Sequence, residues 1–93
     1  MVSIKEELEL AKAAKAAINA LLTATSKPAV LATLKDAYRA AVLNLSGEGL
    51  LNEARGIVGI ALSNIMHGAP TEEKINKAKS AIDTWINNLE LSL

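Results

Sequence analysis

Apolar side chains recur every three or four residues along most of the chain, which is the spacing of one face of an α-helix. Four segments with this pattern are separated by short turns, at about residues 3–25, 28–45, 50–67 and 72–90. Short turns place consecutive helices side by side and in opposite directions. The pattern therefore predicts an all-α fold, a single-domain antiparallel up-down four-helix bundle over residues 1–93.

The predicted helix ends rest on residues that cap or break helices. Ser3 and Glu6 have the spacing of a capping box, and Thr71 is a natural N-cap for the last segment. Pro28 biases the residue before it away from helical angles, so it separates the first two segments. Gly68 follows the third segment, where we expect the left-handed backbone that glycine adopts after a helix.

The second and fourth segments each carry an apolar stripe that we expect to face the core. These stripes are Leu31, Leu34, Tyr38, Ala41, Val42 and Leu45 in the second segment, and Ile75, Ala78, Ile82, Trp85, Ile86 and Leu89 in the fourth. Trp85, the only tryptophan, is in register with its stripe. We expect it in the core, and the alternative is an anchor at a binding interface.

The third segment is the most apolar, and yet it contains glycines. Each glycine inside a helix costs about 1 kcal/mol relative to alanine. Gly56, Gly59 and Ser63 share one face, which would let another backbone come close. Apolar residues cover nearly every other direction, and such a helix is normally buried on all sides. The segment therefore either packs fully inside the bundle or presents apolar surface to another molecule.

Composition and charge exclude several classes of protein. Ten basic and ten acidic side chains cancel, so no strong field points to nucleic acid or to an acidic membrane. The lysines of the first and fourth helices have acids nearby and no interleaved aromatics for base stacking, so we expect no nucleic-acid binding. With no cysteine there are no disulfides and no thiolate metal sites. Seventeen alanines predict a thin, closely packed core.

The chain is expected to be cytoplasmic and not to span a membrane. Its longest uncharged stretch, Gly56 to Thr71, is shorter than the roughly 20 apolar residues of a membrane span. The first residues reach Glu6 and Glu7 before any apolar run, unlike a secretory signal.

Isolated polar residues have simple structural explanations. His67, the only histidine, lies where a cation would meet unpaired helix carbonyls, and we favour this over catalysis or metal binding. The doublets Glu6–Glu7 and Glu72–Glu73 lie in first helical turns, where the helix dipole explains them better than a general acid–base pair. We expect no enzyme activity, no cofactor and no metal.

Two classes of function remain. The first is a non-enzymatic helical module that binds a protein partner or another copy of itself through strips of small residues. These strips are Ala13, Ala16, Ala17 and Ala20 in the first helix, and Gly56, Gly59 and Ser63 in the third. The second is a small-ligand binder or enzyme that uses a cavity between helices, although we regard a small-molecule ligand as the less favoured partner. The polar residues for such a cavity are Tyr38, Arg39, Asn64 and His67.

The region from Lys27 to Leu89 resembles the small four-helix immunity proteins that protect bacteria from their own bacteriocins. The resemblance lies in "KPAVLATLKDAYRAA", a glycine turn, an apolar third helix and "TEEKINKAKSAIDTWINNL". It consists of helix length and hydrophobic pattern without a diagnostic motif, and other helical bundles, phage accessory proteins among them, share it. It implies a four-helix fold and, as an alternative function, a bacteriocin-immunity-like protein, and it assigns no family.

Overall fold

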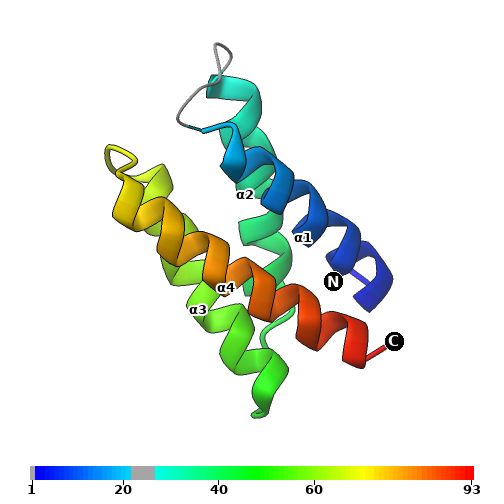
Figure 1. Ribbon diagram of the computed structural model, residues 1–93. Helices are drawn as coiled ribbons and strands as arrows, with labels where there is room; N and C mark the ends of the chain where they lie inside the picture. The colour runs from blue at the N-terminus through cyan, green and yellow to red at the C-terminus, as the bar shows by residue number, and fades with distance from the viewer. Residues whose placement is uncertain (1, 22–26) are drawn as a thin grey trace.

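Over residues 2–21 and 27–93, which are those it describes, the computed structural model forms four helices. They are α1 (Ile4–Asn19), α2 (Lys27–Leu43), α3 (Leu50–Met66) and α4 (Glu72–Leu91). Each helix packs against its two neighbours in the ring α1–α2–α3–α4, and consecutive helices run in opposite directions (Figure 1). The predicted all-α four-helix bundle is confirmed.

The N-terminal caps of α1 and α4 form as predicted. Ser3 Oγ accepts a hydrogen bond from the Glu6 backbone N–H at 3.1 Å, which is the serine half of the capping box. Thr71 Oγ1 accepts from the Lys74 backbone N–H at 3.2 Å. The apolar stripe of α4 faces the core as expected, and Trp85 is fully buried there, so Trp85 is a core residue and not an interface anchor.

Helix α1 ends at Asn19, earlier than the predicted end near residue 25. The Ala20 backbone N–H bonds to the Ala17 carbonyl at 3.0 Å, and the next N–H bonds to Ile18 at 3.2 Å. These tighter bonds close the helix and turn the side chain of the following leucine, Leu21, into the core. The rest of the predicted first segment, residues 22–25, lies outside the described residues.

The predicted buried stripe of α2 is wrong in part. Leu31, Val42 and Leu45 are exposed, and the helix ends at Leu43, before the predicted Leu45. Alanines lie on the face that packs against α1 and α3; the core residues of α2 are Leu34, Ala37, Ala40 and Ala41. Small side chains let helices come close, so α2 keeps its large apolar residues near the rim of the bundle.

The two turns around α3 use glycine differently from each other. Gly47 and Gly49, before the helix, have φ angles of 66° and 138°, which only glycine adopts easily. Gly68, after the helix, does not have the predicted left-handed backbone. His67 is the C-cap instead, and its backbone N–H donates to the Ser63 carbonyl at 3.0 Å.

Candidate interaction surface on helix α3

The four alanines predicted as a partner strip do not form one exposed surface, because Ala17 packs against the core and Ala20 follows the end of α1. Ala13 and Ala16 are exposed, whereas Ala17 and Ala20 are half-buried. The inner side of this helix packs into the core through larger residues such as Leu8 and Ile18. Because exposed alanine methyls offer little apolar surface, this strip provides little to bind.

The small-residue strip of α3 mostly faces α2 of the same chain. A Cβ atom added at Gly59 would lie 3.5 Å from Val42 Cγ2 and 4.0 Å from Tyr38 Cε2. Gly59 is buried, and Ser63 is half-buried with its hydroxyl 3.1 Å from His67 Nδ1. Helix α2 therefore occupies the groove at Gly59. Gly56 differs, because a Cβ atom added there would have nothing within 4 Å.

Helix α3 nevertheless presents large apolar side chains to solvent. Ile57 is 58% exposed and Ile60 is 67% exposed, and Leu50 at the start of the helix is exposed as well. The inner side of the helix supplies the core with Val58, Leu62 and Ile65. The segment is therefore not packed fully inside the bundle, because part of its apolar surface is exposed.

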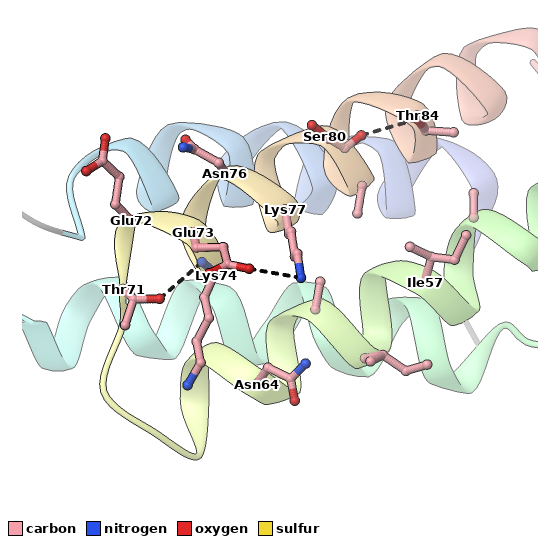
Figure 2. A pocket seen from close by; sticks show the side chains of 14 residues that line it. Ile57, Asn64, Thr71, Glu72, Glu73, Lys74, Asn76, Lys77, Ser80 and Thr84 are labelled. Carbon is pink, nitrogen blue, oxygen red and sulfur yellow. Dashed lines mark hydrogen bonds and ion pairs between the residues drawn. The ribbon is translucent and has the colours of Figure 1, made fainter.

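A groove runs along α3 on the side of α4. Its α3 wall is mostly apolar and includes Ile57 and Ile60. Its α4 wall is mostly polar, with Asn76, Ser80 and Thr84 (Figure 2). Lys77 lies over the groove, with its Nζ 3.4 Å from Glu73 Oε1 (Figure 2). The full lining is Ala54, Ile57, Ile60, Ala61, Asn64, Thr71, Glu72, Glu73, Lys74, Asn76, Lys77, Ser80, Ala81 and Thr84.

A smaller hollow lies on the other side of α3, against α2. It is lined by Tyr38, Val42, Leu45, Arg55, Gly56, Gly59 and Ile60. The open space above Gly56 belongs to this hollow, and Ile60 lines both it and the α3–α4 groove. Ile60 therefore forms a ridge between two depressions. We call Ile57, Ile60, Gly56 and the walls of these two depressions the α3 face.

The polar residues predicted for a cavity do not share one. Tyr38 lines the hollow beside α2, whereas Asn64 lines the groove beside α4. Arg39 and His67 are exposed and line neither depression. His67 Nδ1 lies 3.0 Å from the Ser63 carbonyl oxygen, at the C-terminal end of α3, as expected for a capping role. The geometry required for a binding or catalytic cavity is absent from this set of residues.

A buried carboxylate fixes the position of α3 in the bundle. Glu7, in the first turn of α1, is fully buried. Arg55 of α3 donates hydrogen bonds to both carboxylate oxygens of Glu7: Nε lies 2.9 Å from Oε2, and Nη2 lies 2.8 Å from Oε1. Trp85 Nε1 of α4 donates to Oε2 at 2.7 Å. Asn44 Nδ2, directly after α2, donates to Oε1 at 2.6 Å. We call these four residues the Glu7 cluster. It connects α1, the residue directly after α2, α3 and α4.

The electrostatics of the Glu7 cluster favour the ionised carboxylate. Burial by itself raises the pKa of Glu7, but hydrogen bonds from its three partners and the positive charge of Arg55 lower it. The net result is a pKa below the ordinary value of 4.5. Arg55 Nη1 also donates to Asn52 Oδ1 at 2.8 Å. Glu7 is thus shielded from solvent and hydrogen-bonded to Asn44, Arg55 and Trp85, and this cluster joins the helices through an ionised carboxylate.

The interpretation of Glu7 from the sequence is wrong. Its neighbour Glu6 is exposed in the first helical turn, as expected for a residue that interacts with the helix dipole, but Glu7 points into the core. One signal was present in the sequence, because Glu7 lies four residues before the core residue Ala11 and so shares its helix face. The partners Asn44, Arg55 and Trp85 come from distant segments, and helical spacing does not indicate that they meet.

The comparisons with known proteins leave the family open. The chain has no match among protein-family models, curated proteins or solved structures. None of the helices in the described residues is both long and apolar enough to cross a membrane. Within the same residues, no three histidine, aspartate or glutamate side chains gather where they could hold a metal ion.

Proposed function

We propose that this protein is a non-enzymatic helical module that binds another protein molecule through the α3 face. The exposed side chains of Ile57 and Ile60 carry this proposal. They lie in an uncharged run from Gly56 to Thr71, beside two depressions that a partner can enter. Contiguous apolar surface of this kind, with a polar rim, is typical of protein–protein interaction sites.

The energetics favour a partner at this face. Moving an isoleucine side chain from water into an apolar environment contributes about 1.5–3 kcal/mol. Ile57 is 58% exposed and Ile60 is 67% exposed, so more than half of this gain is not made within the chain. A partner that covers these side chains would obtain the remainder. The dispersed positions of Tyr38, Asn64 and His67 further favour a binding role over a catalytic one.

Photocrosslinking in the cells that produce the protein tests this proposal. A benzophenone amino acid is placed at position 60 on the α3 face and, in two control proteins, at position 12 or position 16 on α1. All three positions are exposed. We expect a crosslinked protein product from position 60 and none from position 12 or position 16. Equal crosslinking from all three positions, or none from position 60, would refute the proposal.

A further inference from the structure

We propose that the turn between α2 and α3, residues 43–53, is a second binding surface, shaped for a basic and apolar peptide segment of another protein. The inference goes beyond the proposed function, because it does not use the exposed isoleucines of the α3 face. Its starting point is a group of exposed leucines. Leu43 is 64% exposed, Leu45 is 44% exposed and Leu50 is 74% exposed. Three large apolar side chains therefore reach solvent from one short turn.

Hydrogen bonds that start from the Glu7 cluster anchor this turn. Asn44, within the turn, is buried and donates from Nδ2 to Glu7 Oε1 at 2.6 Å. Arg55 Nη1 donates to Asn52 Oδ1 at 2.8 Å, and Asn52 Nδ2 donates in turn to the Ser46 carbonyl oxygen. Two glycines with positive φ angles complete the turn between these anchors. The backbone that carries the exposed leucines is thus tied to the core at both of its ends.

An anchored turn with exposed apolar side chains is suited to binding. Loops held by a rigid scaffold commonly carry binding residues. A turn that is already ordered loses little conformational freedom when a partner binds, so less of the binding energy is spent on ordering it. A partner that covers the leucines also obtains the apolar burial that they do not have within the chain.

The turn lies at the acidic end of the bundle. Its charged side chains are Glu48 and Glu53, both of them exposed. Figure 1 places the turn at the same end as the start of α1 and the end of α4. This half of the bundle, residues 2–11, 36–58 and 82–93, contains eight of the ten acidic side chains and only three of the ten basic ones. One of the three is Arg55, which is buried and paired with Glu7. The formal net charge of zero therefore conceals a separation of charge along the bundle.

The charge and the leucines together define the chemistry of the partner. Carboxylates gathered at one end produce a negative potential, which attracts basic side chains and repels acidic peptides, nucleic acids and anionic lipid surfaces. The exposed leucines are covered only by a partner that also has apolar side chains. A peptide segment that combines lysine or arginine with large apolar residues meets both conditions.

Isothermal titration calorimetry of the purified chain with a short synthetic peptide of lysine and leucine, from about 1 µM to about 1 mM, tests the inference over the range of weak peptide affinities. Two peptides of the same length serve as comparisons, one of glutamate and leucine and one of lysine and serine. We expect the lysine–leucine peptide to bind, less tightly as salt is added, and the other two to bind at least about tenfold more weakly. No binding of the lysine–leucine peptide, or equal binding of all three, would overturn the inference.

Matched variants at the same end of the bundle locate the site. Leu50→Ser and Glu48→Gln change the turn, whereas Leu91→Ser and Glu90→Gln make the same changes at the end of α4, where Leu91 is 76% exposed and Glu90 is exposed. Leu50→Ser should weaken binding of the lysine–leucine peptide about tenfold, as loss of a hot spot does, and Glu48→Gln should reduce its salt dependence. The two α4 variants should stay within about twofold of the wild type. All four side chains are exposed, so the variants should remain folded, which circular dichroism verifies. Equal losses from the turn and from α4 would show unspecific attraction to the acidic end and would overturn the inference.

Two further measurements separate this surface from its alternatives. Leu45 also lines the hollow of the α3 face, so the two surfaces adjoin. Ile60→Ser should leave binding of the lysine–leucine peptide within about twofold of the wild type, and a larger loss than that of Leu50→Ser would overturn the inference in favour of the α3 face. Phosphatidylcholine vesicles should not bind the chain, and binding to them that Leu50→Ser abolishes would overturn the inference in favour of a lipid surface. Crosslinking from position 60 does not depend on the turn, so this inference and the proposed function fail separately.

Discussion

Replacing Glu7 by glutamine keeps the size of this side chain and removes its charge. Both carboxylate oxygens accept hydrogen bonds, from Arg55, Trp85 and Asn44. A glutamine amide has one acceptor oxygen and one NH₂ group, and the NH₂ group can only donate. In Glu7→Gln this NH₂ group must therefore lie against N–H donors whose hydrogen bonds the second carboxylate oxygen accepted. The guanidinium of Arg55, a residue that is only 6% exposed, is then left without its counter-charge.

We expect Glu7→Gln to destabilise the fold by about 3–5 kcal/mol, the usual cost of removing one partner of a buried ion pair. A chain of 93 residues has a total stability of about 5–14 kcal/mol, so the loss is a large fraction of the whole. The melting temperature should fall by at least about 12 °C. Glu6→Gln is the matched control, since Glu6 is exposed, and its effect should stay below about 1 kcal/mol.

Urea unfolding followed by the fluorescence of Trp85 measures these free energies. Trp85 is the only tryptophan, is fully buried and donates to Glu7 in the folded state, so its emission reports loss of the cluster. Adding Arg55→Met to Glu7→Gln removes the stranded charge, and the double variant should be less destabilised than the sum of the two single variants. A cost below about 1 kcal/mol for Glu7→Gln, or strict additivity, would refute the role assigned to the Glu7 cluster.

Three further predictions concern pH and the glycines of α3. The pKa of Glu7 is lower in the folded chain than its ordinary value of 4.5, so its carboxylate stabilises the fold above pH 4.5. This contribution is lost as pH falls through the folded-state pKa. Urea titrations at several pH values should show the loss in the wild type and not in Glu7→Gln. Gly56→Ala should raise the stability of the monomer by up to about 1 kcal/mol in thermal melts, and a decrease would show that the space above Gly56 is filled within the chain. Gly59→Ala should be tolerated, since its Cβ would lie at an ordinary contact distance of 3.5 Å from Val42 Cγ2. Gly59→Leu should lower the free energy of unfolding by about 1–3 kcal/mol, because the larger side chain overpacks this contact. Equal melting temperatures for these two variants would show that α2 does not pack there.

Helix number and order, and the N-terminal caps of α1 and α4, could be predicted from the sequence because they depend on local signals. In α4, a single stripe of large apolar residues and the cap at Thr71 both indicate the same helix, and both are confirmed. In α2 the signal is ambiguous, because alanines and large apolar residues occupy neighbouring faces. The alanines Ala37 and Ala41 lie in the core, and the larger Val42 lies at the margin, because close contact with the adjacent helices favours small side chains.

The candidate site could be predicted only in part. The composition of α3 indicated surplus apolar surface, and the structure places this surplus at Ile57 and Ile60. Which residues of an apolar helix face outward depends on its rotation in the bundle, and the cluster formed by Glu7 and Arg55 helps to fix that rotation. Contacts of this kind join residues far apart in the chain, so helical periodicity does not reveal them.

The most direct measurement of the central claim is photocrosslinking in cells from two exposed positions on the α3 face, 57 and 60, and from two exposed positions on α1, 13 and 16. If the α3 face is the binding surface, crosslinked protein products should form from positions 57 and 60 and not from positions 13 and 16. Crosslinks from α1 alone, or none from positions 57 and 60, would contradict the account.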